Sequence, residues 1–213
     1  KCYVAKLKPN MIEIDGEVKD ITPVGSNFTE APWVHKHNGK YYLTFAQNWP
    51  EKLGYAVSDS PEGPFEYKGI FSEVAGNSNT THPAIVEFKG KTILFTHNGG
   101  LHEGTSYSRS VCAQELKYDK KGNILKCDIT TDGVPYLEEY YDRKSKEEKA
   151  IRKMESKMGA YLMVYHKDAD HGLHMAISYD GLEFIALNDD KPLIAGDTIA
   201  EQKGIRDPHI FRG

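Results

Sequence analysis

Three ionisable residues share one local setting, because each stands directly before a proline-led apolar run. Glu30 precedes an Ala-Pro pair, His82 precedes Pro83, and Asp207 precedes Pro208. A carboxylic acid and a carboxylate that flank a sugar ring are the groups that cleave a glycosidic bond with inversion. A single acidic residue before a proline more often caps a turn or faces solvent. It is the recurrence of the setting that favours a carbohydrate-active site.

These settings belong to a repeated unit. The segments 31–45 and 82–96 each hold a proline, an apolar run, a Gly-Lys turn and a second apolar run, and they lie about 50 residues apart. The pattern starts again at Asp207, and the segment 56–65 is similar to 176–184. Repeats of this length built from short strands predict the blades of a β-propeller.

Each unit is expected to fold as antiparallel strands, because Asn-Gly and Lys-Gly pairs between apolar runs are hairpin signals. The fold class is therefore predicted to be all-β, with an incomplete propeller as the architecture. A β-sandwich is the alternative, since short alternating strands do not separate the two. The predicted strands are 34–37, 40–45, 54–58, 65–71, 84–88, 92–97, 108–118, 124–128, 161–166, 173–178 and 184–187.

One stretch, residues 136–158, breaks the strand pattern and is dense in charged residues. Opposite charges four residues apart, such as Asp142 and Lys146, support a helix. We interpret the stretch as a solvated helical linker, with a partner-binding helix as the alternative. It divides the chain into 1–135, the linker, and 159–213.

The composition narrows the classes of partner. The chain has 213 residues and a net charge of −4, which argues against a broad electrostatic grip on nucleic acid or acidic lipid. No apolar run approaches the roughly 20 residues that span a bilayer. We expect neither a nucleic-acid nor a membrane partner. The three cysteines are too scattered for a disulfide scaffold or a zinc site. The first residue is not Met and the last follows a strand-like run, so a fragment is expected.

Several segments, taken together, resemble glycoside hydrolase family 43. The run Thr-Glu-Ala-Pro-Trp around Glu30 resembles the general-acid motif of that family, and the run Gly-Ile-Arg-Asp-Pro-His around Asp207 is similar to its general-base motif. The segments 77–83 and 106–112 look like later blades of its arabinofuranosidase and xylosidase members. The resemblance covers 1–134 and 159–213.

The resemblance implies a five-bladed propeller that hydrolyses β-xylosidic or α-L-arabinofuranosidic links of xylan- or arabinan-derived oligosaccharides with inversion. It makes Glu30 the general acid and Asp207 the general base. No residue matches the third carboxylate of the family, an Asp that orients the acid. His82 matches an axial His that contacts a calcium ion through water or holds water in the pocket, and Arg109 matches a substrate-contacting Arg. No cofactor is required, and calcium on the propeller axis is the candidate ion.

Two tryptophans are candidates for stacking on a sugar face, which is a common use of an amphipathic aromatic ring. Trp33 follows the Glu30 motif, and Trp49 lies in a Gln-Asn-Trp-Pro loop. Phe45, in an apolar run, is expected to fill the core instead. The substrate-binding set is therefore predicted to be Arg109, Trp33, Trp49 and His82.

The order of the motifs departs from the family, in which the base precedes the acid. One hypothesis is a tandem protein, in which 1–135 ends one propeller and 159–213 begins a second, so that Glu30 and Asp207 serve different sites. The alternative is one circularly permuted propeller. Under the tandem hypothesis the chain alone is expected to be inactive. A non-catalytic propeller that binds carbohydrate or a protein is a separate alternative.

Overall fold

The described part of the chain is built from antiparallel strands. This computed structural model describes residues 1–88, 90–134, 159–196 and 203–211. Within these ranges the elements are strands and one short 3-10 turn, η1 (Asn188–Asp190), so the all-β prediction is confirmed. The helix predicted at 136–158 lies outside the described residues. None of the described segments forms a helix long and apolar enough to cross a bilayer.

The best-formed sheet is a four-stranded meander, which we call the first blade. Its order is β3 (Phe28–His37), β4 (Lys40–Gln47), β5 (Lys52–Ser58) and β6 (Glu66–Ser72). The β3–β4 hairpin turns at Asn38 and Gly39, whose φ values of 48° and 80° match the tight turn that the Asn-Gly pair predicts.

Strand β4 is buried on both faces. Tyr41, Leu43 and Phe45 point into one cluster, which also holds Cys2 and Phe65. The alternate residue Tyr42 points into a second cluster on the opposite face of the sheet. Successive side chains of a strand point to opposite faces, so an apolar run without polar alternation is what such a position requires. The first blade is therefore an inner layer with a core on each side.

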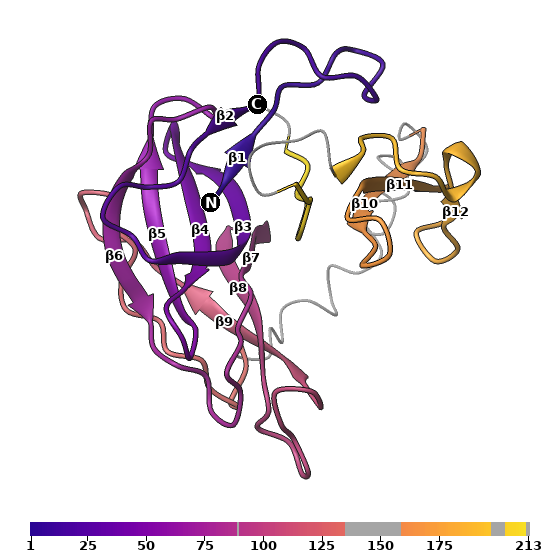
Figure 1. Cartoon of the computed structure of the whole chain (residues 1–213). Coiled ribbons are helices and arrows are strands. Elements are labelled where there is room, and N and C mark those ends of the chain that lie inside the picture. The colour runs from indigo at the N-terminus through magenta and orange to yellow at the C-terminus, as the bar shows by residue number, and fades with distance from the viewer. Residues whose placement is uncertain (89, 135–158, 197–202, 212–213) are drawn as a thin grey trace, which may run out of the picture.

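A three-stranded sheet, the second blade, packs against the first. It consists of β7 (Ala84–Phe88), β8 (Lys91–Asn98) and β9 (Ser110–Leu116). Figure 1 shows β3 and β7 as neighbouring strands of the two blades, with β6 on the outside. The core between the blades combines residues of both, namely Tyr42, Leu53, Tyr55, Phe71, Ile85, Leu94, Leu116 and Ile124.

The strand predicted at 124–128 as the outermost strand of the second blade is wrong in extent. Only Ile124 pairs, through an isolated bridge to Tyr118. The chain then turns toward the first blade, where the Cys127 amide donates to the Phe71 carbonyl at 2.7 Å. Satisfying this donor across the interface replaces the ladder that a fourth strand would have made.

The remaining strands form two small sheets. In one of them β1 (Tyr3–Val4) pairs with β2 (Lys19–Asp20). The other, which we call the third sheet after the two blades, contains β10 (Tyr161–His166), β11 (Leu173–Ser178) and β12 (Ile185–Ala186). The segment 203–211 has no regular structure, although the repeat pattern starts again at Asp207. It extends from the third sheet toward the first blade in Figure 1, where Phe211 packs edge-on against Tyr41 at 5.8 Å between ring centroids.

Candidate active site

Strand β3 carries Glu30 on an irregular stretch. The pairing with β4 shifts register between Phe28 and Glu30 and again between Glu30 and Trp33. Between them Ala31 has a φ of 55°, in the left-handed region that non-glycine residues rarely adopt. Such irregularities bend a strand and redirect its side chains. Glu30 thus lies within the strand and not before it, and the bulged backbone orients it.

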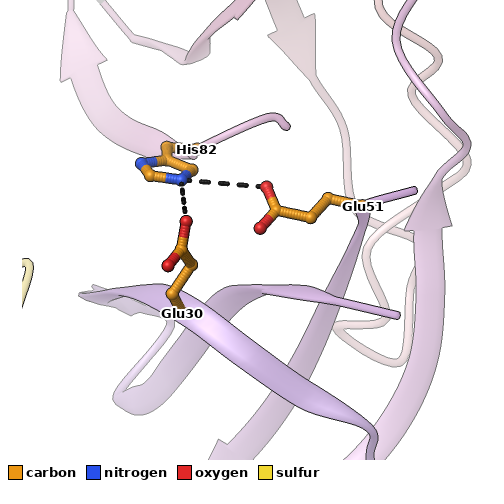
Figure 2. Close-up of side chains that lie close together, drawn as sticks. All are labelled: Glu30, Glu51 and His82. Carbon is orange, nitrogen blue, oxygen red and sulfur yellow. Dashed lines mark hydrogen bonds and ion pairs between the residues drawn. The ribbon is translucent and has the colours of Figure 1, made fainter. Parts of the chain in front are cut away.

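Three side chains from separate parts of the chain converge here. The Nε2 atom of His82 lies 3.0 Å from Oε1 of Glu30 and 3.7 Å from Oε2 of Glu51. Figure 2 shows both carboxyl groups directed at the same edge of the imidazole ring. The structure therefore brings the predicted Glu30 and His82 together and adds a second carboxyl group to them.

Glu51 is the most buried member of this cluster. It is 1% exposed, and its Oε2 accepts a hydrogen bond of 2.8 Å from the Thr81 amide. Burial raises the pKa of its carboxyl above the usual value, and the negative charge of Glu30 acts in the same direction, while the Thr81 amide and His82 oppose them. Its other oxygen, Oε1, has no hydrogen-bond partner among the described residues.

A second imidazole continues the cluster toward the predicted Arg109. The rings of His82 and His97 lie 5.3 Å apart, and Nη1 of Arg109 is 3.4 Å from Nε2 of His97. Burial lowers the pKa of His97 to about 4, and the neighbouring His82 and Arg109 act in the same direction. His97 is therefore neutral at ordinary pH, which lets its Nε2 accept a hydrogen bond from the guanidinium.

Asp207 lies beside the Glu30 strand. Its Oδ2 accepts a hydrogen bond of 3.3 Å from the Ala31 amide, and its own amide donates to Nδ1 of His166 at 3.3 Å. The preceding residue, Arg206, places Nη1 3.9 Å from Oε2 of Glu30. The two predicted catalytic carboxyl groups thus lie on adjacent backbone, with a cation next to one of them.

The two tryptophans differ in their surroundings. Trp33 is partly buried at the interface between the blades, donates a hydrogen bond from Nε1 to the Ile85 carbonyl at 3.0 Å, and lies tilted against the His209 ring with centroids 4.2 Å apart. Trp49 is 67% exposed in the loop that follows β4. Of the two, Trp49 has the ring that a sugar can reach, while the indole N–H of Trp33 is already engaged.

Three residues of this site, Glu51, His97 and Arg206, are not among those predicted from the sequence. Arg206 lies inside the Asp207 motif, so its adjacency was a usable signal. Glu51 follows the Trp49 loop, but nothing local distinguishes a buried glutamate from the exposed ones that are the norm. Its role depends on contact with a segment about 30 residues away.

The two described blades, of four and three antiparallel strands, are the arrangement expected of a β-propeller protein. The sequence profile of "Glycosyl hydrolases family 43" matches residues 1–124. The chain belongs to that family, as the resemblance of the motifs indicated.

Individual relatives agree with this assignment. A "Xylosidase/arabinosidase" of Bacteroides ovatus is 42% identical over 135 residues, which is 57% of this chain and 41% of the relative. A "Beta-xylosidase" of Xylanibacter ruminicola is 47% identical over 98 residues, covering 46% of this chain and 30% of the relative. The chain therefore spans well under half the length of these relatives.

Solved structures give the same fold. The structure of "RS223-Beta-xylosidase" matches 59% of this chain and 42% of its own, with a TM-score of 0.56 and 34% identity. A β-xylosidase/α-arabinofuranosidase from a compost metagenome, solved with xylotriose in a calcium-free form, matches 63% of this chain and 42% of its own, with a TM-score of 0.55 and 32% identity. The described sheets are therefore part of a β-propeller, and the propeller prediction is confirmed over the sandwich.

Proposed function

We propose that the chain is part of a glycoside hydrolase that cleaves β-xylosidic or α-L-arabinofuranosidic links by an inverting acid/base mechanism. Glu30 is the general acid and Asp207 a general base, and they act in one site in a permuted propeller and in two separate sites in a tandem protein. The observation that carries the proposal is the placement of both carboxyl groups on adjoining backbone, with Asp207 bonded to the amide of the residue after Glu30.

Each carboxyl group carries out one proton transfer in this mechanism. Protonated Glu30 gives its proton to the leaving-group oxygen as the glycosidic bond breaks. Ionised Asp207 takes a proton from water as that water attacks the anomeric carbon from the opposite face, which inverts its configuration. The N–H of His82 and the guanidinium of Arg206 both face Glu30, and they stabilise the carboxylate that remains after proton transfer.

The tandem and permuted hypotheses predict different origins for these two groups. In either one, the reaction needs an Asp-Pro motif next to the Glu30 strand, and the segment 203–211 occupies such a position here. In a tandem protein the equivalent strand of the first propeller would take that place, and Asp207 would serve the second. We keep the division at 1–135, 136–158 and 159–213 as part of this proposal.

Substrates are proposed from the relatives. One structural neighbour was solved with xylotriose, and relatives carry the names xylosidase and arabinosidase. Xylan- and arabinan-derived oligosaccharides are therefore the proposed substrates. Trp49 and Arg109 are proposed to contact them, because Trp49 is exposed in the loop that leads to Glu51 and Arg109 is exposed beside His97.

Calcium fits poorly as a direct ligand of this cluster. Glu30, Glu51 and His82 place one ligand atom each within 4.8 Å of the others. Calcium prefers six to eight oxygen ligands, whereas this set has two carboxyl groups, one of them almost fully buried, and an imidazole nitrogen. We therefore route no step through a metal. Contact of His82 with calcium through water stays a prediction of the resemblance.

The test of the proposal is Glu30→Gln in the natural full-length protein. We expect kcat on xylobiose or an arabinofuranosyl oligosaccharide to fall by about 10²–10⁴-fold, because glutamine cannot donate the proton. NMR of the first-formed sugar should show inverted configuration at the anomeric carbon. Unchanged kcat, or retained configuration, would overturn the proposal.

The 213-residue chain by itself is expected to show no turnover of aryl xylosides or arabinofuranosides. The reason is that no residue matches the acid-orienting Asp of the family. The chain is assayed beside the full-length protein at matched concentration. Turnover by the chain that Glu30→Gln abolishes would contradict the tandem arrangement and favour the permuted one.

A further inference from the structure

Glu51 has a contact pattern that the proposed acid/base pair does not explain. It is 1% exposed. A buried carboxyl group that lacks some of its hydrogen bonds destabilises the folded state, because its lost contacts with water are not replaced. Among the described residues its Oε1 has no partner. A residue of this type in this place needs a reason beyond packing.

Glu51 fastens the backbone that carries His82. Its amide donates to the Asn79 carbonyl at 2.8 Å, and its Oε2 accepts from the Thr81 amide at 2.8 Å. Both partners lie within three residues of His82, on the segment that leads into β7. The main chain and the side chain of one residue thus hold this segment against the start of β5.

The same carboxyl group also faces the imidazole. Its Oε2 lies 3.7 Å from Nε2 of His82, the atom that lies 3.0 Å from Glu30. A negative or polar oxygen on that edge favours the ring orientation and tautomer in which Nε2 carries the proton. Figure 2 shows Glu51 and Glu30 approaching this nitrogen from different directions. A rotated imidazole would take Nε2 away from its 3.0 Å contact with Glu30 and from the facing oxygen of Glu51.

We propose that Glu51 is a positioning residue that holds His82 with Nε2 toward Glu30, and so keeps the general acid aimed at the leaving-group oxygen. The inference rests on the proposed function. Glu51 acts through His82 and touches no substrate atom. Its loss should therefore lower proton donation by Glu30 more than it lowers substrate binding.

Substrates whose leaving groups differ in acidity distinguish a loss of acid catalysis from a non-specific loss of activity. A dinitrophenolate leaves without help from an acid, whereas the sugar alcohol released from xylobiose must be protonated. In the full-length protein we expect Glu51→Gln to lower kcat on xylobiose by about 10–100-fold, since small misplacements of a catalytic group cost this much. On a dinitrophenyl β-xyloside kcat should fall less than 3-fold, and KM for xylobiose should change less than 3-fold.

The ratio of the two kcat values is still informative for a destabilised variant. Both apparent kcat values scale with the folded fraction, so their ratio does not depend on it. If Glu51→Gln fails to fold, Glu51→Asp is measured in the same way, because it keeps the charge and shortens the reach. Glu66→Gln, at an exposed site on the outer strand of the same blade, is the matched control and should leave both rates unchanged.

The outcomes separate the two proposals. A leaving-group effect for both Glu30→Gln and Glu51→Gln supports the inference. The effect for Glu30→Gln alone, with equal losses on both substrates or none for Glu51→Gln, overturns the positioning role and leaves the proposed function standing. If Glu30→Gln shows no leaving-group effect, the proposed function itself fails.

Discussion

The two blades have similar strands but different surroundings. In the first blade, β4 is buried on both faces, whereas the second blade is buried chiefly on the face that carries Ile85 and Leu94. On its other face Val86 and Phe95 are each 39% exposed, and Val111 is 81% exposed. The carboxyl groups Glu30 and Glu51 both belong to the first blade or its loops. Among the described residues, Glu30 therefore lies in the blade whose central strand is covered on both faces.

The largest expected effect is on stability. Phe45 in β4 is 0% exposed and Phe95 in β8 is 39% exposed, although both lie on the second strand of a blade. We expect Phe45→Ala to lower the free energy of unfolding by about 3–5 kcal/mol, as for other fully buried large side chains. Phe95→Ala should cost about 1 kcal/mol or less. Urea unfolding followed by tryptophan fluorescence measures both, and equal losses would contradict the difference between the blades.

The next effect depends on pH and compares His35 in the first blade with His97 in the second. Burial lowers the pKa of His35 to about 3, and the neighbouring His37 acts in the same direction. The unfolded chain protonates this residue near 6.5, so it binds more protons than the folded state between these values. Stability should therefore fall as the pH drops from 6.5 toward 4.5, at roughly 1 kcal/mol per pH unit from His35.

Unfolding midpoints at these two pH values test the assignment to His35. His35→Gln should flatten the dependence, because its side chain does not titrate. His97→Gln should flatten it by nearly the same amount, since a folded pKa of about 4 also lies below this pH window. His102→Gln, in an exposed loop, is the control and should leave the slope unchanged. An equal slope in the His35 variant and the parent would show that other groups dominate.

The smallest expected effect concerns surface ion pairs. Lys40 pairs with Asp59 in the first blade, and Lys91 pairs with Glu115 at 3.1 Å in the second. The Lys40 pair is open to solvent and the Lys91 pair is partly buried, and Asp59→Asn and Glu115→Gln should each cost about 1 kcal/mol or less. Thermal melts at low and high salt measure this. A decrease of more than 2 kcal/mol in the free energy of unfolding of either variant would mean that surface charge, and not core packing, accounts for the difference in stability between the two blades.

The regular parts of the fold were predictable from local pattern. The strands 84–88, 161–166 and 173–178 agree with the structure at both ends, since each is an apolar run bounded by turn residues. The run at 124–128 failed because it stays beside the end of β9 only at Ile124 and Leu125, after which the Cys127 amide bonds to the first blade. Glu30, His82 and Asp207 were found through a repeated motif. Glu51 was not, because only folding brings it into contact with the segment that contains Thr81.

The two buried faces of β4 have a consequence for strand alignment. In most sheets a slip of one residue is prevented because it would place apolar side chains in water. A slip of β4 exposes nothing, since both faces are covered, so solvent does not select its alignment. The Asn38-Gly39 turn and the two shifts beside Glu30 must fix it instead. The irregular backbone that orients Glu30 therefore also fixes the register of β4 in the first blade.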